Sequence, residues 1–121
     1  MLGILIDKDL QKVNKVFVPI FGIGDVFLID YAQKMIYNND SQVTILDNDS
    51  QAKNNFIIEN AVAALEEKYP NNIAVFNPEK LNKPFLLQQD LVIISIETWK
   101  KLVDDQVEWL SNIPSVLIVK P

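Results

Sequence analysis

Cysteine, histidine and arginine are absent from the sequence, and all eleven basic residues are lysines. Without thiols or imidazoles, the chain has no disulfide framework, no thiolate or imidazole metal site and no cysteine or histidine nucleophile. Without arginine it lacks the forked guanidinium that binds phosphate at two points, and sixteen acidic residues give a net charge of −5. These absences predict a protein that does not bind nucleic acid.

Glycine and long apolar runs are also scarce. The chain has three glycines, too few for the glycine-rich loop of a Walker-type phosphate site. No apolar run approaches the ~18–20 residues of a membrane-spanning helix, and the N-terminal segment is too short and too acidic for a signal peptide. The sequence therefore predicts a soluble domain with no direct membrane insertion, which is also compatible with a piece of a larger membrane protein.

The length of 121 residues fits one domain with a single core. We assign residues 15–121 to this domain and residues 1–14 to a leader or linker. Two interpretations of the leader remain open: it pairs as an edge strand through Leu2, Ile4 and Ile6, or it trails away from the domain.

Five short apolar runs, rich in β-branched residues, alternate with longer segments of helical periodicity. They are apolar at successive positions, which is typical of parallel strands covered by helices on both faces. The pattern predicts an α/β fold, a doubly wound three-layer sandwich around a five-stranded parallel sheet. The five predicted strands are Val16–Phe21, Val43–Leu46, Ile73–Phe76, Leu91–Ile96 and Val116–Val119.

The segments between these runs predict the helices. Apolar residues recur at three- and four-residue steps in three of them, and proline or asparagine follows where the pattern stops. Asp25 is the expected N-cap of the first helix, and the two tryptophans are expected to fill the core or an interface. The expected helices cover about residues 28–37, 56–69, 79–81 and 99–110.

Candidate site residues follow the strands, because ligands of open α/β sheets bind beyond the carboxyl ends of the strands. Gly22, Gly24 and Asp25 follow the first strand, and Asp47 follows the second. The glycine pair is similar to the start of a dinucleotide-binding fingerprint, but Phe27 stands where the third glycine belongs. A turn is therefore favoured over anion binding for these glycines.

The aspartates near this edge allow two interpretations. Asp25, Asp47 and Asp49 serve as caps and turn formers, which is the common use of aspartate at such positions, or they hold a hard cation in a magnesium-dependent hydrolase. No histidine is present to activate the five serines and two threonines. We therefore favour the first interpretation and expect a non-catalytic protein without a cofactor or metal.

Four segments occur in an order and spacing known from one family. They are Lys15–Ile20, Gln42–Leu46, Asp90–Ile94 and Ile113–Lys120. Together they resemble a universal stress protein domain over about residues 15–120. The resemblance implies the strand order 3-2-1-4-5.

The residues that hold ATP in that family are not matched. Its ATP-binding members carry an aspartate where this chain has Phe21, and a glycine stretch that has no counterpart after Ile96. Their G-[S/T] pair corresponds to Leu102-Val103, followed here by Asp104-Asp105, whose charges would repel phosphate. The resemblance implies a degenerate nucleotide site, although Val43 matches the residue that flanks adenine.

Degenerate domains of this kind resemble the cytoplasmic C-terminal domains of bacterial cation/proton (sodium/hydrogen) antiporters. The resemblance implies a non-catalytic regulatory domain in the cytoplasm, tethered to the inner membrane when it is part of a transporter. It also implies a homodimer through the last strand, because the apolar edge at residues 115–119 needs a cover.

A second function remains open. A free universal stress protein-like module would bind an adenine nucleotide or another small anion. Its expected ligand-binding residues are Gly22, Gly24, Asp25, Val43 and Asp47.

Overall fold

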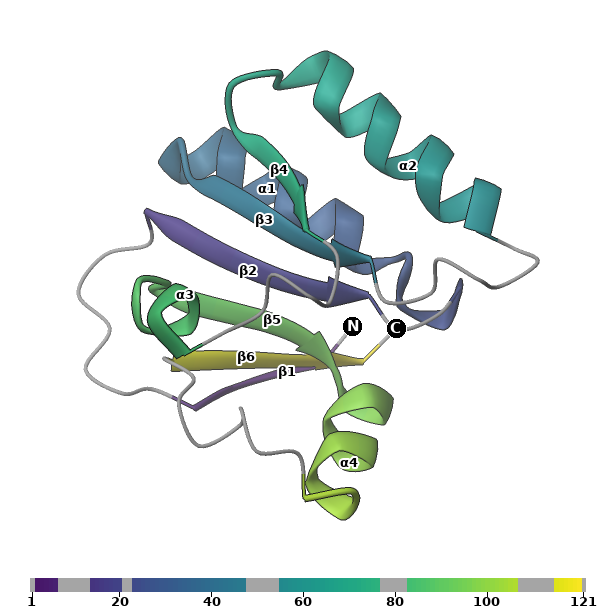
Figure 1. Cartoon of the computed structure of the whole chain (residues 1–121), viewed down its shortest axis with the longest axis vertical. Coiled ribbons are helices and arrows are strands. Elements are labelled where there is room, and N and C mark those ends of the chain that lie inside the picture. The colour runs from purple at the N-terminus through teal and green to yellow at the C-terminus, as the bar shows by residue number, and fades with distance from the viewer. Residues whose placement is uncertain are drawn as a thin grey trace.

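The computed structural model describes residues 2–6, 14–20, 23–47, 55–76, 83–106 and 115–120 (Figure 1). Its strands are β1 (Leu2–Ile6), β2 (Lys15–Ile20), β3 (Gln42–Asp47), β4 (Ile73–Phe76), β5 (Leu91–Ser95) and β6 (Ser115–Lys120). Its helices are α1 (Leu28–Asn39), α2 (Asn55–Lys68), α3 (Lys83–Leu87) and α4 (Ile96–Asp104), with a short 3-10 turn, η1, at Ile23–Asp25.

The described strands form one sheet in the order β1-β6-β5-β2-β3-β4. The pairs from β4 through β6 are all parallel, so the predicted five-stranded sheet in the order 3-2-1-4-5 is confirmed. β1 adds an antiparallel edge strand, with Leu2 opposite Lys120 and Ile6 opposite Val116. The structure therefore agrees with the interpretation in which the leader pairs as an edge strand.

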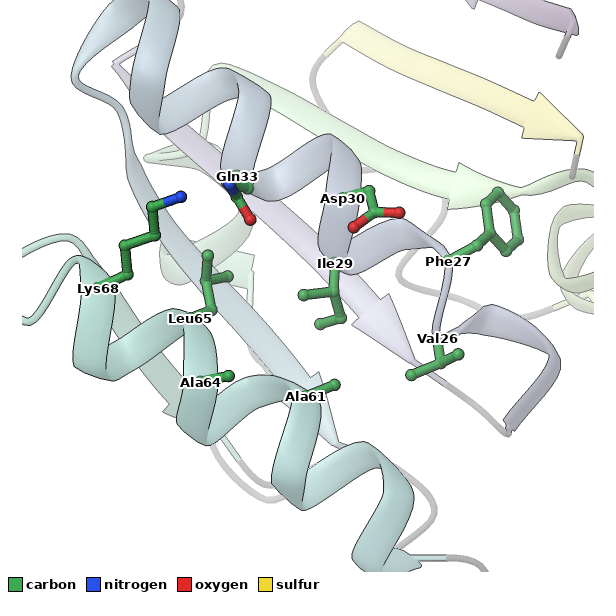
Figure 2. Close-up of a pocket in the computed structure, with 9 residues that line it drawn as sticks. All are labelled: Val26, Phe27, Ile29, Asp30, Gln33, Ala61, Ala64, Leu65 and Lys68. Atoms are coloured by element: carbon green, nitrogen blue, oxygen red, sulfur yellow. The ribbon is translucent and has the colours of Figure 1, made fainter.

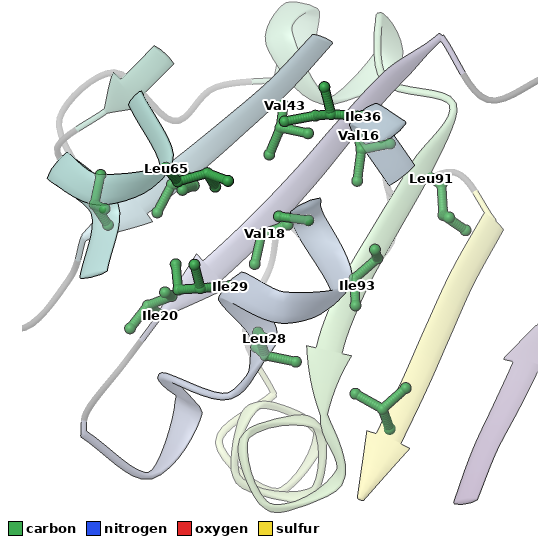
Figure 3. Close-up of a cluster of buried hydrophobic side chains, with 14 residues drawn as sticks. Val16, Val18, Ile20, Leu28, Ile29, Ile36, Val43, Leu65, Leu91 and Ile93 are labelled. Carbon is green, nitrogen blue, oxygen red and sulfur yellow. The ribbon is translucent and has the colours of Figure 1, made fainter. Parts of the chain in front are cut away.

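Alternate residues of the central strand face two separate cores. Val16, Val18 and Ile20 of β2 pack toward α1 and α2, as Figure 3 shows, whereas Phe17 packs toward α3 and α4. The first core also takes Leu28, Ile29, Ala32 and Ile36 from α1 and Val62 and Leu65 from α2. The second takes Leu86 from α3 and Leu102 from α4. Helices thus cover both faces of the sheet, as the uninterrupted apolar strands predicted.

The first two helices match the predicted segments, and the later ones differ at their ends. α3 begins at Lys83 with Pro84 in its first turn, where a missing N–H costs nothing. The short helix expected at residues 79–81 falls outside the described residues. α4 begins at Ile96, which the sequence analysis placed at the end of the preceding strand, and it ends at Asp104. Residues 107–114 are also not described.

Trp99 is half-buried against the second core, as predicted for a core-filling aromatic residue. No helix among the described residues combines the length and the apolar character needed to cross a bilayer.

Candidate functional site

The order in which successive strands are added to the sheet reverses between the parallel neighbours β2 and β5. From β2 the chain continues to β3 and β4 on one side of the sheet, and from β5 it continues to β6 on the other. Open α/β sheets bind ligands in the crevice beyond the carboxyl ends of the two strands at such a switch point. Here that place is occupied by η1, on the β2 side, and by the first turn of α4, which follows β5 directly.

A buried carboxylate lies at this switch point. Asp25 ends η1 and is 6% exposed. Its Oδ1 accepts a hydrogen bond from Ser95 Oγ at 2.6 Å, and its Oδ2 accepts one from Thr98 Oγ1 at 2.8 Å. Both oxygens of the carboxylate are therefore directed at the start of α4.

Ser95 connects the carboxylate to the helix backbone. It is the last residue of β5 and the N-cap of α4, and its Oγ accepts a hydrogen bond from the Thr98 amide at 3.2 Å. The same hydroxyl therefore donates to Asp25 and accepts from Thr98. All three side chains are buried, so the hydrogen bonds among them are shielded from water.

The N-terminus of a helix attracts negative charge, because its first amides carry unpaired N–H groups aligned with the helix dipole. In α/β proteins this feature commonly holds a phosphate of the ligand. Here the negative charge is supplied by the protein itself through Asp25. The network of Asp25, Ser95 and Thr98 fills the place that an anionic ligand takes in related architectures.

The geometry of this network suits a structural role better than a catalytic one. Ser95 Oγ donates a hydrogen bond to a carboxylate, as a serine nucleophile does to the basic side chain that activates it. However, Ser95 is 2% exposed and its oxygen is engaged with the Thr98 amide. A substrate atom cannot approach Ser95 Oγ unless η1 and the start of α4 move apart.

The prediction that Asp25 caps the first helix is wrong. The N-cap of α1 is Phe27, and no side chain makes a capping hydrogen bond there. The carboxylate of Asp25 is instead turned toward Ser95 and Thr98, because two buried hydroxyls need an acceptor. Asp25 therefore contributes to the start of a helix distant in sequence, α4, and does not cap the adjacent one.

Only one of the two glycines predicted at the site lies among the described residues. Gly22 falls outside the described residues, as does Phe21. Gly24 is exposed, its φ is not positive, and a Cβ built on it would meet nothing within 4 Å. Nothing in the local geometry therefore requires glycine at position 24.

The two predicted residues of the second strand lie at opposite ends of β3. Val43 is the second residue of the strand and is buried in the first core, in register between Val16 and Ile73. Asp47 is the last residue of β3, in register with Ile20. At about 3.3 Å per residue the two lie roughly 13 Å apart. The structure thus brings Asp47 toward the end of the sheet that holds Asp25 and keeps Val43 away from it. Asp49 is not described.

The segment expected in place of the family's second glycine motif is helical. Leu102 is buried in the second core and Val103 is half-exposed, and both lie inside α4. Amides in the interior of a helix donate to carbonyls one turn back. They cannot form the open backbone cradle that a phosphate needs.

Ser95 is the site residue that the sequence analysis missed, because it was assigned to the interior of a strand. The segment Ser95-Ile96-Glu97-Thr98 does contain a usable pattern. A serine followed by a helix with an acidic first turn is typical of an N-cap. Thr98, in the first turn of the same helix, was likewise not among the candidate site residues.

A groove of about 500 Å³ lies between α1 and α2 and reaches Val26 and Phe27, the two residues that follow Asp25 (Figure 2). Ile29 from α1 and Leu65 from α2 contribute apolar surface, and the small side chains of Ala61 and Ala64 leave space. Figure 2 shows Lys68 extending from α2 toward α1 at one end of the groove. The lining is mainly apolar, which suits packing.

No protein-family model matches the sequence, and no curated protein matches it. The fold and the network around Asp25 are therefore the observations from which a function has to be argued.

Proposed function

We propose that this chain is a universal stress protein-like regulatory domain of a monovalent cation/proton antiporter and that it is not an enzyme. The observation that carries the proposal is the carboxylate of Asp25 at the switch point, with both oxygens bonded to the start of α4. A domain with the scaffold of a nucleotide binder and an internal anion in the phosphate position is suited to regulation without nucleotide turnover.

Electrostatics support the absence of nucleotide binding in the family mode. An incoming phosphate at the start of α4 would meet a buried carboxylate with the same sign of charge. Displacing that carboxylate would leave the hydroxyls of Ser95 and Thr98 without their acceptor, which costs about 1–3 kcal/mol for each buried group. Phosphate contacts would have to offset both penalties.

A regulatory domain without a ligand at its switch point acts through its surface and its assembly. The proposed assembly is a homodimer through the last strand, β6. In the structure the outer edge of β6 is paired with β1 along Leu2–Ile6. The proposed dimer therefore forms when β1 leaves this edge, because a strand has only two edges and β5 occupies the other.

This competition makes β1 the regulatory element of the proposal. Paired with β6, it protects an apolar edge strand from association. Released, it exposes the edge for the same strand of a second copy, in the isologous manner of a two-fold dimer. The partner that responds to the release of β1 is the membrane portion of the transporter, on its cytoplasmic side. That portion belongs to the same chain or to another one.

Two experiments test the proposal. The native gene, read upstream and downstream of this segment and in neighbouring genes, is expected to encode the membrane helices of an antiporter. In proteoliposomes, removing this domain is expected to change the dependence of cation-driven proton movement on ion concentration while exchange itself continues. A gene with no transporter in or beside it, or unchanged transport after the removal, contradicts the proposal.

Calorimetry distinguishes the proposed regulatory domain from the alternative, a module that binds an adenine nucleotide. Titration with ATP and with AMP, each with and without magnesium, is expected to give no heat at millimolar nucleotide. Heat that disappears on Asp47→Ala, but not on the matched change Asp104→Ala in α4, would favour the alternative at the predicted residues.

A further inference from the structure

The groove between α1 and α2 continues along the outer surface of α1. A second hollow, of about 320 Å³, adjoins the groove, because Asp30 and Gln33 line both. Tyr37, about two turns after Asp30, also lines the second hollow. Along α1 the two hollows together extend roughly 12 Å from Ile29 to Tyr37, at 1.5 Å per residue. We call the groove and this second hollow the α1–α2 surface.

The groove has an apolar floor and little above it to fill the space. Ile29 from α1 and Leu65 from α2 line it and are buried. On the α2 side Ala61 is half-buried and Ala64 is exposed. The residues Ala61, Ala64 and Leu65 are three and four positions apart, so they form one stripe along α2, which Figure 2 shows facing α1. Two short side chains in such a stripe leave room for the side chains of a third helix.

Tyr37 extends the apolar surface beyond the groove. Its side chain is 79% exposed. A single exposed aromatic residue needs no explanation by itself, but Tyr37 lies in the hollow that continues the groove. Tyrosine is common in protein interfaces, because its ring packs against apolar groups while its hydroxyl stays hydrogen-bonded. A partner that lies along α1 would cover Tyr37 and the groove together.

The charge of the surrounding residues favours a basic partner. On α1, its C-cap and α2, exposed acidic side chains outnumber exposed lysines by five to two. The acidic residues are Asp30, Asp40, Glu59, Glu66 and Glu67, and the lysines are Lys34 and Lys68. A surface with this excess of negative charge attracts a basic partner and repels an anionic membrane or an acidic peptide.

Both lysines lie against aromatic rings of their own helix or its end. Lys34 Nζ is 5.5 Å from the centre of the Tyr31 ring. Lys68 Nζ is 5.7 Å from the centre of the Tyr69 ring. These cation–π contacts hold the two positive charges beside tyrosine rings, so the acidic residues dominate what an approaching partner meets.

We infer that the α1–α2 surface docks an amphipathic helix of a partner protein that carries lysine or arginine beside its apolar ridge. Apolar side chains three and four residues apart on that helix fill the space over Ala61 and Ala64. Its basic side chains pair with Asp30 on α1 and with Glu67 on α2. Glu67 is three residues after Ala64, so the two are neighbours on the surface of α2.

The inference rests on the proposed function only for the source of this helix. Segments on the cytoplasmic side of membrane-spanning helices are rich in lysine and arginine. In the proposed regulatory role, the docked helix is such a segment of the transporter. Because the groove reaches Val26 and Phe27, the docked helix would also contact the segment that follows Asp25 at the switch point.

The test is a ¹H–¹⁵N NMR titration of the whole chain with a synthetic basic peptide. The probe has about 15 residues, the length at which an alanine-rich helix becomes stable in water. Leucines at three- and four-residue steps form its ridge, lysines flank the ridge, and alanines fill the other positions. It is expected to shift the amides of Ile29, Gln33 and Ala64. The amides of Trp99 and Lys100 in α4, on the opposite face of the sheet, are expected to stay in place.

Two control peptides separate charge from shape. The first carries glutamate in place of every lysine and keeps the leucine ridge. The second keeps the composition of the probe and distributes the leucines around the helix. Each is expected to bind roughly tenfold more weakly than the probe, or worse, because docking needs both the apolar ridge and the basic flanks.

Ala64→Arg tests the location of the docked helix. The substitution places a bulky basic side chain in the groove and is expected to weaken binding of the probe roughly tenfold or more. Ala63→Arg is the matched control, because Ala63 is exposed on the same helix and does not line the groove. Both variants change the net charge equally, so a general loss of electrostatic attraction would be the same in both. Both sites are exposed, so both variants are expected to fold.

Three results of the titration would overturn the inference: the probe shifts no amide of the α1–α2 surface, either control peptide binds as tightly as the probe, or Ala64→Arg binds like Ala63→Arg. Two further results would assign the surface to another occupant and also overturn it. Shifts of the same amides with protein concentration alone would indicate a second copy. Co-sedimentation with phosphatidylglycerol vesicles that Ala64→Asp abolishes and Ala63→Asp does not would indicate a membrane.

Failure of the docking inference can be distinguished from failure of the proposed function. If the gene and its neighbours encode no transporter, the proposed function is contradicted, and the probe is still expected to bind. If a transporter is encoded and the probe does not bind, the docking inference is overturned and the proposed function stands. The peptide comparisons use the wild-type chain, so they decide the question even if a variant does not fold.

Discussion

The hydroxyl of Thr98 donates a 2.8 Å hydrogen bond to Oδ2 of Asp25, which lies 73 positions earlier in the chain. This bond joins the segment after β2 to the first turn of α4 across the switch point of the sheet. The second oxygen of Asp25 accepts from Ser95, the residue that caps the same helix. A carboxylate thus holds together the two halves of the doubly wound fold.

Asp25→Ala is expected to lower the free energy of unfolding by about 2–4 kcal/mol, because it leaves two buried hydroxyls without an acceptor and removes the charge at the start of α4. Urea denaturation followed by circular dichroism measures the loss. Asp30→Ala is the matched control, since Asp30 is exposed in the first turn of α1, and a change within about 0.5 kcal/mol is expected there. Equal losses in both variants would contradict a structural role of Asp25.

Thr98→Val tests whether Asp25 and Thr98 act as a pair. The substitution keeps the shape of the side chain and removes the hydroxyl, so Asp25 Oδ2 loses this donor. In a double-mutant cycle, Asp25→Ala and Thr98→Val together are expected to cost less than the sum of the single changes, by roughly 0.5–2 kcal/mol. Thr44→Val, in the middle of β3, is the control partner and should be additive with Asp25→Ala. Additivity of Thr98→Val with Asp25→Ala would show that the bond contributes nothing measurable.

Phosphate is expected to stabilise Asp25→Ala more than the wild type. In the variant the start of α4 lacks its internal anion, and a free anion is attracted to that helix terminus. The melting temperature is measured against phosphate concentration, with sodium chloride at equal ionic strength as the control for screening. A phosphate dependence that is the same in both proteins would mean that Asp25 does not occupy an anion position.

The sheet was predictable because its information is local. Strands such as Val16–Ile20 are apolar at successive positions, and this pattern belongs to parallel strands covered on both faces. α1 was predictable because Leu28, Ala32 and Ile36 recur with the period of a helix. These patterns depend on neighbours in the sequence, so the fold class did not require tertiary information. The confirmed strand order was implied by the resemblance to universal stress protein domains and not by these patterns.

The site was less predictable because it depends on contacts between distant residues. Asp25 was identified as a candidate, but its helix N-cap role was wrong, since no local pattern shows that Ser95 and Thr98 lie beside it. The sequence analysis also did not predict that Val43 lies at the amino end of β3, far from the crevice. The unpaired carboxamide oxygen of Gln89 in the described part of the chain could not be predicted from the sequence, because only its burial in the fold makes it unusual.

Deletion of residues 2–6 is expected to convert the chain from monomer to dimer. β1 pairs with β6 from Leu2 opposite Lys120 to Ile6 opposite Val116, and its loss exposes the N–H and C=O groups of an otherwise apolar strand. Sedimentation velocity over a range of protein concentrations measures the association. Gly3→Pro together with Ile4→Pro should act in the same direction at full length. Successive N–H groups of a strand point to opposite edges, so one of the two prolines removes a donor to β6.

The matched control locks the same strand in place. Because the chain has no cysteine, Leu2→Cys with Lys120→Cys introduces a single thiol pair at two residues that are opposite each other in the antiparallel register. Paired Cα atoms in such a ladder are about 4.5–5.5 Å apart, which a disulfide spans. The oxidised variant is expected to stay monomeric at concentrations where the deletion variant is dimeric, and reduction should restore wild-type behaviour. A deletion variant that remains monomeric, or an oxidised variant that dimerises equally well, would place any self-association elsewhere than at β6.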